Sequence, residues 1–178
     1  MITIRDRTID VLFSAEAIAT QVDRLSREIA RTAGEDLVVV SVLKGAFVFA
    51  ADLIRALHRA GVAPQVEFIS LSSYGAGTVG GEVKILRDID ADVAGRKVLL
   101  VDDILESGRT LKFAETLLRQ RGASDVELAV LLDKKGHRKA EIEADFIGFN
   151  CPDHFVVGYG MDVGHAFREL PFIGHVVD

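Results

Sequence analysis

The 178-residue sequence predicts an α/β fold in which helices flank a mostly parallel central sheet. Short runs rich in Val, Leu and Ile recur along the chain, as expected for strands that are buried on both faces of a parallel sheet. Segments with the apolar spacing of amphipathic helices separate several of these runs. Strands that alternate with helices favour right-handed crossovers, and therefore parallel neighbours.

The predicted strands are short apolar runs bounded by polar or glycine-containing segments. They lie at residues 37–43, 66–71, 83–86, 98–101, 126–132, 146–149 and 155–157. The segments before Leu37 and after Phe149 depart from the alternation of strands and helices. We expect these segments to form a lid or hood over the ends of the strands.

Three segments place their apolar residues on one helical face, and each is followed by a glycine that can end a helix. The predicted helices are 14–32, 47–60 and 111–120, with the glycines at positions 34, 61 and 122. Ser14 can cap the first helix, because its hydroxyl can accept a hydrogen bond from a backbone N–H of the first turn.

Three of the predicted strands are followed by polar residues. Lys44-Gly45 follows one strand, Asp102-Asp103 follows a second, and Asp133-Lys134-Lys135 follows a third. The carboxyl ends of parallel strands lie at one edge of the sheet, where ligands of open α/β sheets bind, so these residues can converge on one ligand. In the alternative interpretation, the strand ends are polar because they meet solvent.

The most informative motif is VLLVDDILESGRTL, from Val98 to Leu111. Asp102 and Asp103 close its apolar run, and a short segment from Glu106 to Thr110 leads into a helix. Such a loop can direct backbone N–H groups at an anion, and the helix N-terminus favours negative charge. Two carboxylates beside a phosphate cradle predict a phosphorylated ribose as the ligand. Alternatively, the acids are solvated and the loop is an ordinary connection.

Two further segments could contact such a ligand. Lys44-Gly45 offers a cation and an unobstructed backbone to a diphosphate, although the pair also suits a plain strand-to-helix turn. The stretch from Ser72 to Gly81 contains four glycines and could close over a reactive ligand to exclude water. The alternative for this stretch is a long hairpin tip.

The second half of the chain adds candidates for binding a base and a metal. Lys134 and Lys135 could donate to a carbonyl-bearing ligand, or belong to a solvated basic turn. Phe155 could stack on a planar base, although an aromatic residue in an apolar strand is more often part of the core. Asp162 could bind Mg²⁺ directly or through water, or serve as a turn residue. The five histidines show no spacing of metal ligands, so we expect them at the surface or in local hydrogen bonds.

The composition narrows the class of protein. The apolar fraction of 49% suits one globular domain, and the net charge of −6 argues against a general electrostatic grip on nucleic acid or anionic lipid. Cys151 is the only cysteine, which excludes an intrachain disulfide and fits a reducing, cytoplasmic compartment. The N-terminal segment lacks the apolar core of a signal peptide, and no run approaches the ~20 apolar residues of a membrane span.

Several motifs resemble those of the hypoxanthine phosphoribosyltransferase family. VLLVDDILESGRTL resembles the phosphoribosyl diphosphate signature of the type I phosphoribosyltransferases. The narrower resemblance rests on SVLKGAFVFAADL, on ISLSSYGAG followed by GEVKILRDID, and on PDHFVVGYGMD with FRELPFIG. The resemblance extends from about Leu37 to the end of the chain.

The resemblance implies the type I phosphoribosyltransferase fold in a single domain, 1–178, with a small hood contributed by about 1–12 and 150–178. It implies purine salvage, in which a 5-phosphoribosyl group moves from phosphoribosyl diphosphate to N9 of hypoxanthine or guanine. The products would be IMP or GMP and diphosphate, with Mg²⁺ as the cofactor. The resemblance also suggests a homodimer or homotetramer.

By the same resemblance, each candidate residue takes a role. Asp102 and Asp103 would bind the ribose hydroxyls, directly or through Mg²⁺ and its waters. The phosphate and diphosphate would be contacted by Lys44, Gly45, Arg168 and the segment Glu106, Ser107, Gly108, Arg109 and Thr110. The family often has a cis peptide bond just before the residue that corresponds to Lys44. Ser73 and Tyr74 would lie in the loop that closes over the reaction. The purine contacts would fall to Lys134, Phe155, Val156 and Asp162, and Asp162 would also coordinate Mg²⁺.

Two positions depart from the family's usual pattern. Glu106 stands where the family usually has Asp, the residue that takes the purine N7 proton or holds it by a hydrogen bond. We hypothesise that Glu106 keeps this role despite its extra methylene. Ala46 stands where many relatives have a second glycine, and we expect little effect from this difference.

Two alternative functions share the expected fold. The pyrimidine-operon attenuation proteins carry the same signature and bind RNA, which calls for a basic face that the net charge of −6 disfavours. A transferase that prefers xanthine or guanine is the second alternative, because the sequence does not fix the backbone geometry that reads the purine 2-position.

Overall fold

A computed structural model describes residues 1–4, 7–73 and 82–177, and its centre is a six-stranded sheet. The strands follow the order β5-β4-β3-β6-β7-β8, and every neighbouring pair is parallel except β4 and β5. Their bounds are β3 Val38–Leu43, β4 Gln65–Ser73, β5 Val83–Arg87, β6 Lys97–Leu105, β7 Asp125–Asp133 and β8 Phe146–Asn150. The predicted mostly parallel sheet is therefore confirmed.

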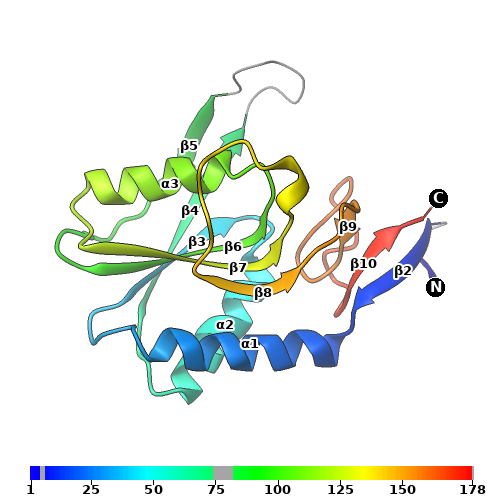
Figure 1. The fold of residues 1–178 in the computed structure, drawn as a ribbon, viewed down its shortest axis with the longest axis horizontal. Coiled ribbons are helices and arrows are strands. Elements are labelled where there is room, and N and C mark those ends of the chain that lie inside the picture. The colour runs from blue at the N-terminus through cyan, green and yellow to red at the C-terminus, as the bar shows by residue number, and fades with distance from the viewer. Residues whose placement is uncertain (5–6, 74–81, 178) are drawn as a thin grey trace.

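Three helices cover the two faces of this sheet (Figure 1). Helices α1 (Ala15–Ala30) and α2 (Phe47–Arg59) lie on one face, and α3 (Arg109–Gln120) lies on the other. The three predicted helices are confirmed within two residues at each end. Ser14 caps α1 as expected, because its hydroxyl accepts a hydrogen bond from the Ala17 N–H at 3.2 Å.

Alternating side chains of the central strands feed two separate hydrophobic cores. Val39 and Leu99 pack in the core beneath α1 and α2, whereas Val40 and Leu100 pack in the core beneath α3. All four side chains are fully buried. This burial on both faces explains why the central strands read as continuous apolar runs rather than alternating ones.

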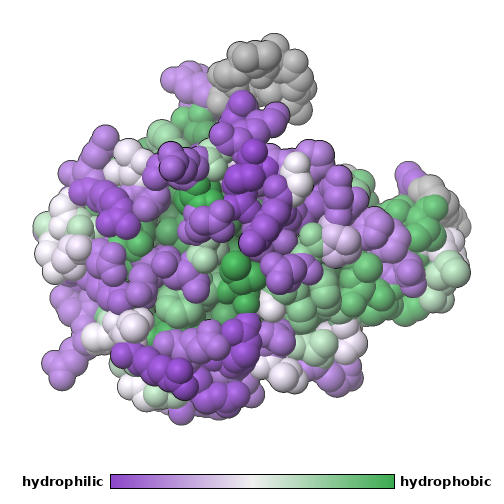
Figure 2. Space-filling view, in the orientation of Figure 1, coloured by the Kyte–Doolittle hydropathy of each residue, from purple (hydrophilic) through white to green (hydrophobic). Residues whose placement is uncertain are grey.

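A second, antiparallel sheet is built from strands near the two ends of the chain. Its order is β1-β2-β10-β9, with β1 Ile2–Ile4, β2 Arg7–Phe13, β10 Ile173–Val176 and β9 Val156–Val157. It lies at one side of the molecule, beside the end of β8 (Figure 1). Figure 2 shows hydrophobic residues gathered on this lobe, while the face over α3 is more hydrophilic.

The structure differs from the predicted elements at three places. The strand expected at 98–101 continues to Leu105, because β6 stays paired with β7 as far as Leu105, which lies opposite Asp133. Both acids of the motif, Asp102 and Asp103, therefore lie within the strand. Phe155 precedes β9 rather than lying in it. The strands β1, β2 and β10 carry little of the Val and Leu character used in the prediction and were missed. No helix among the described residues is long and apolar enough to cross a bilayer.

Candidate active site

The predicted residues at the strand ends line two adjoining cavities. The first, of about 660 Å³, lies between the ends of β3, β6 and β7 and the C-terminal segment. Its lining includes Lys44, Gly45, Asp103, Glu106, Lys134, Phe155, Val156, Asp162 and Arg168. The second, of about 260 Å³, shares part of this wall and adds Asp102, Ser107, Gly108 and Thr110. Three loops that are distant in the sequence thus face one space.

Three of the predicted residues lie apart from these walls or beyond description. The side chain of Arg109 is exposed at the first position of α3 and lines neither cavity. Ser73 is the last residue of β4. Tyr74 and most of the glycine-rich stretch lie outside the described residues, so the expected closing loop is not described.

Asp102 and Asp103 form a pair of adjacent carboxyl groups at the edge of the sheet. Asp102 is buried, and its carboxylate accepts a hydrogen bond from the Asp103 N–H at 2.9 Å. Burial and the neighbouring charge of Asp103 raise the pKa of Asp102 well above its usual value. Burial also raises the pKa of Asp103, although Arg168 acts in the opposite direction. When both groups are ionised, this pair favours a ligand that brings a cation or hydroxyl donors.

Gly45 brings the loop after β3 against this acid pair. A Cβ atom at Gly45 would lie 1.9 Å from Asp103 Oδ2, so the close approach requires glycine. The peptide bond between Leu43 and Lys44 is cis, which the resemblance of the sequence led us to expect. From the other side, Gly160 packs on the Gly45 carbonyl, since a Cβ at Gly160 would lie 2.4 Å from that oxygen.

The segment after β6 forms the phosphate-type cradle at the start of α3. Gly108 is the N-cap of this helix and takes a φ of +78°, which a non-glycine residue rarely adopts. Gly108, Thr110 and Leu111 at the start of α3 line the smaller cavity, where the helix dipole favours an anion. The Ser107 carbonyl accepts hydrogen bonds from the Lys139 and Ala140 N–H groups at 2.9 and 3.0 Å.

Arg138 holds this segment in place and was not singled out from the sequence. Its guanidinium donates to the carbonyls of Glu106 at 3.0 Å and of Ile142 at 2.7 Å. It also pairs with the buried Asp133 at the end of β7. One arginine thus ties the ends of β6 and β7 to the following loop. The charged stretch LDKKGHRK predicts a solvated turn, and nothing in it indicates that Arg138 makes these contacts.

Lys134 and Glu106 form an ion pair in the wall of the 660 Å³ cavity. Lys134 is buried, and its Nζ donates to Glu106 Oε1 at 2.8 Å. Its backbone N–H donates to the Leu105 carbonyl at 2.9 Å, which fixes the residue at the end of β6. The solvated-turn interpretation is therefore wrong for Lys134, because the side chain turns inward between the strand ends. Lys135, in contrast, is exposed.

Phe155 and Val156 lie at the opposite wall of the same cavity. Phe155 is 63% exposed, so the interpretation that places it in the core is wrong. A large aromatic ring left exposed at the mouth of a cavity has a face free to stack on a planar ligand. Val156 is buried and begins β9, which fixes the backbone beside the ring.

Asp162 lies in a turn and is already paired with Arg168. Its Oδ1 lies 2.7 Å from a guanidinium nitrogen of Arg168, and its Oδ2 accepts from the His165 N–H at 2.8 Å. Arg168 also donates to the Gly160 carbonyl at 2.6 Å. These contacts tie the turn to the Gly45 loop, and they leave Arg168 at the wall of the cavity.

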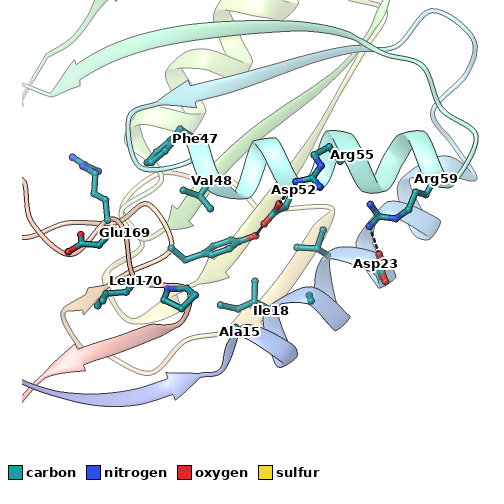
Figure 3. Close-up of a pocket in the computed structure, with 15 residues that line it drawn as sticks. Ala15, Ile18, Asp23, Phe47, Val48, Asp52, Arg55, Arg59, Glu169 and Leu170 are labelled. Carbon is teal, nitrogen blue, oxygen red and sulfur yellow. Dashed lines mark hydrogen bonds and ion pairs between the residues drawn. The ribbon is translucent and has the colours of Figure 1, made fainter. Parts of the chain in front are cut away.

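A cavity of about 810 Å³, larger than either of these, lies between α1 and α2 and shares Arg168 with the strand-end cleft (Figure 3). Apolar residues of both helices, among them Ile18, Phe47 and Val48, form much of its lining. At its edge the Tyr159 hydroxyl donates to Asp52 at 2.5 Å, and burial together with that carboxylate raises the pKa of Tyr159. Four of the charged residues around it form the pairs Asp52–Arg55 and Asp23–Arg59, whereas the strand-end cleft gathers the acid pair, the glycine loop and the buried lysine, so that cleft remains the candidate active site.

A parallel sheet whose strand ends present carboxylates, a glycine loop and a helix N-terminus defines an α/β protein built to bind a sugar phosphate or nucleotide. Comparison with known proteins narrows this class. Residues 8–163 match the phosphoribosyl transferase domain family, and the chain belongs to this family.

The relatives cover the chain almost completely. A hypoxanthine-guanine phosphoribosyltransferase of Aquifex aeolicus is 44% identical over 178 residues, which cover 98% of each chain. A bifunctional TilS/HprT protein of Listeria monocytogenes is 45% identical over 92% of this chain, but the chain spans only 25% of that protein. A solved Trypanosoma cruzi hypoxanthine phosphoribosyl transferase superposes with a TM-score of 0.91 at 35% identity, covering 98% of this chain and 94% of that one.

Proposed function

We propose that this protein transfers the 5-phosphoribosyl group of phosphoribosyl diphosphate to N9 of hypoxanthine and guanine, giving IMP or GMP and diphosphate. The observation that carries the proposal is one cleft with two chemically distinct halves. An acid pair and a helix N-terminus form one half, and a buried lysine opposite an exposed phenylalanine forms the other. The first suits a sugar phosphate, and the second suits a planar base with a carbonyl group.

In the sugar half, we propose that Asp102 and Asp103 bind the ribose hydroxyls. Ser107, Gly108 and Thr110, together with the backbone of Glu106 and Arg109, would hold the 5-phosphate at the start of α3. Lys44, the Gly45 backbone and Arg168 would contact the diphosphate. Their positive charges would stabilise the departing diphosphate as positive charge builds on the ribose ring. Closure of the loop that contains Ser73 and Tyr74 would limit hydrolysis of the activated sugar.

Mg²⁺ is the proposed cofactor, and the chemistry of the donor set fits this ion. The carboxylates of Asp102 and Asp103 are hard oxygen ligands, and burial raises the pKa of both, so a bound cation would favour their ionised forms. Asp162 is the third proposed ligand, although both of its oxygens are engaged by Arg168 and the His165 N–H, so Arg168 would have to turn toward the diphosphate first. When bound, Mg²⁺ would neutralise charge on the leaving diphosphate.

In the base half, we propose that Lys134 donates to the purine 6-oxo group, Phe155 stacks on the ring and the Val156 backbone reads its edge. Adenine has an amino group at this position, and a donor facing a donor leaves a buried group unpaired at a cost of ~1–3 kcal/mol. Glu106 would take the N7 proton or hold it by a hydrogen bond as the new bond forms at N9. The 2.8 Å contact between Glu106 and Lys134 supports this proposal, because it places the Glu106 carboxylate beside the lysine proposed to contact the base.

Three remaining expectations concern domain organisation, assembly and location. We propose a single domain, 1–178, in which the sheet formed by β1, β2, β9 and β10 is the hood. In the Trypanosoma cruzi relative, the C-terminal region has a role in the oligomeric state of that protein, and we propose a homodimer or homotetramer here. A cytoplasmic location is proposed because the single Cys151 suits a reducing compartment.

The decisive experiment offers phosphoribosyl diphosphate and Mg²⁺ with hypoxanthine, guanine, xanthine or adenine and measures the nucleotide formed. We expect product with hypoxanthine and guanine and little or none with adenine. Product with xanthine and guanine alone would favour the xanthine- or guanine-preferring alternative. Absence of product with every base, together with salt-dependent retention of RNA, would favour the RNA-binding regulator and overturn the enzyme proposal.

A further inference from the structure

Lys134 is held by two carboxylates that come from different parts of the chain. Its Nζ lies 2.8 Å from Glu106 Oε1, just after β6, and 3.6 Å from Asp153 Oδ1, just before β9. The lysine side chain is 8% exposed, whereas those of Glu106 and Asp153 are 42% and 64% exposed. The inner ammonium group thus depends on two outer carboxylates for its charge balance.

Asp153 is itself fixed by a neighbour, despite its exposure. His137 Nε2 lies 2.9 Å from Asp153 Oδ2, the oxygen that does not face Lys134. The hydrogen bond from His137 lowers the pKa of Asp153, with the charges of His137 and Lys134 acting in the same direction. Asp153 is therefore ionised at neutral pH and held between a histidine on one side and the lysine on the other.

The same cluster could be mistaken for a metal centre. Glu106, His137 and Asp153 offer ligand atoms within 4.8 Å of one another. The Lys134 ammonium, however, already pairs with both carboxylates of this group. A positively charged group at that point makes the entry of a metal cation unfavourable, so the cluster is better understood as a device that acts on Lys134.

The proposed reaction creates a need for such a device. Glu106 must give its carboxylate to the purine N7–H, which takes away the shorter of the two contacts of Lys134. An ammonium group that is largely removed from water and loses its partner is strongly disfavoured. Without a second carboxylate, the Lys134 ammonium would move with the Glu106 carboxylate or shift toward solvent. Its hydrogen bond to the purine 6-oxo group would then be lost.

We propose that Asp153 is a positioning residue that holds the Lys134 ammonium against the base while Glu106 is engaged with N7, and that His137 fixes Asp153 for this task. The inference rests on the proposed function, because it requires Lys134 and Glu106 to face the purine. Asp153 acts through Lys134 and has no role toward the ribose or the diphosphate. Its loss should consequently weaken binding of the base and leave binding of phosphoribosyl diphosphate unchanged.

The test compares the KM values of the two substrates in wild type, Asp153→Asn, Asp153→Glu and His137→Asn. A pair of charges at this distance, even when screened by water, changes an equilibrium by about fivefold or more. We expect Asp153→Asn to raise the KM for hypoxanthine by about that factor and to leave the KM for phosphoribosyl diphosphate unchanged. Asp153→Glu should restore most of the loss, and His137→Asn should shift the hypoxanthine KM in the same direction by less.

Asp36→Asn is the matched control, because Asp36 is also an exposed aspartate in an ion pair, with Arg96 at 2.8 Å, but lies away from the cleft. It should change neither KM. An active wild type with an unchanged hypoxanthine KM in Asp153→Asn would overturn the inference, and so would an equal rise in both KM values. If Asp153→Asn does not fold, an unchanged hypoxanthine KM in His137→Asn overturns it instead. A wild type that forms no nucleotide with any base would defeat the proposed function itself.

Discussion

Replacement of Gly45 by alanine tests the close contact between the loop after β3 and the acid pair. An added Cβ would lie 1.9 Å from Asp103 Oδ2 and 2.8 Å from Asp103 Cγ, where ordinary contact begins at 3.4 Å. The carboxylate or the loop must therefore move by about 1.5 Å. Gly45 does not take a positive φ, so alanine meets no backbone strain and the contact alone decides the outcome.

The displacement sets the magnitude of two expected effects. Overpacking costs about 1–3 kcal/mol, which in a chain of this length lowers the Tm by roughly 2–12 °C. A misplacement of ~1 Å at a reacting centre costs about 100-fold, so kcat/KM for phosphoribosyl diphosphate should fall by about two orders of magnitude. The Tm is measured by thermal melting without ligand, and kcat/KM by nucleotide formation at saturating hypoxanthine.

Two variants make the result of Gly45→Ala interpretable. Gly136→Ala adds a Cβ that meets nothing within 4 Å and takes no positive φ, so it should keep the wild-type Tm and activity. Gly45→Ala combined with Asp103→Ala removes the clashing carboxylate, and this pair should recover stability but not activity. A Gly45→Ala protein with the wild-type Tm and wild-type kcat/KM would refute the argument that this contact shapes the site.

Three further predictions concern the same cleft. Because the pKa of Asp102 is raised in the folded protein, its contribution to stability is full below about pH 4 and is lost as the pH rises through the raised value. The Tm of Asp102→Asn should therefore be close to the wild-type Tm at pH 4 and should exceed it by a growing margin toward pH 8. The margin should be about 2–4 °C for each kcal/mol of unfolding free energy recovered. A difference in Tm that does not change with pH would contradict this. Glu106→Gln should lower turnover at saturating substrates by about 100-fold or more, as expected for loss of acid–base assistance, and unchanged turnover would reject its role. Gly108→Ala should cost about 1–2 kcal/mol for the left-handed φ, and more because its Cβ would lie 2.6 Å from Ile142 Cγ2, and it should also weaken phosphoribosyl diphosphate binding. Gly122→Ala has a similar φ of +86° at the far end of α3 and meets no atom closer than 3.5 Å, so it should cost only the φ strain, in stability alone.

The central fold was predictable because its strands are buried on both faces. Val38–Leu43 and the apolar part of β6 are unbroken apolar runs of strand length. Such runs are typical of strands buried on both faces of a parallel sheet. Strands β1, β2 and β10 of the small sheet escaped prediction because they are only partly buried and mix polar with apolar residues, as in the sequence RTIDVLF of β2. Their pairing joins the two ends of the chain, which local sequence patterns do not reveal.

Contacts at the site were less predictable than the positions of its residues. The order of strand, acids, glycine loop and helix brought Asp102, Asp103 and Gly108 together near the carboxyl end of β6, because local connectivity fixes them, although both acids lie inside the strand rather than after it. The inward turn of Lys134 and the bracing role of Arg138 depend on partners about 30 residues away, at Glu106 and Leu105. Nothing in the basic run around them distinguishes these two side chains from exposed ones such as Lys135.

The two halves of the cleft manage charge in opposite ways. In the sugar half, burial and the adjacent charge of Asp103 make Asp102 costly to ionise, and a ligand that brings a cation or hydroxyl donors would offset that cost. In the base half, Glu106 and Asp153 already pair with the Lys134 ammonium, and Asp153 also with His137. A ligand in the sugar half therefore gains from the charge that it brings, whereas a neutral base can only exchange one hydrogen-bond partner for another. Affinity in the first half is consequently set by the acid pair, and selectivity in the second by how firmly Lys134 is held in place.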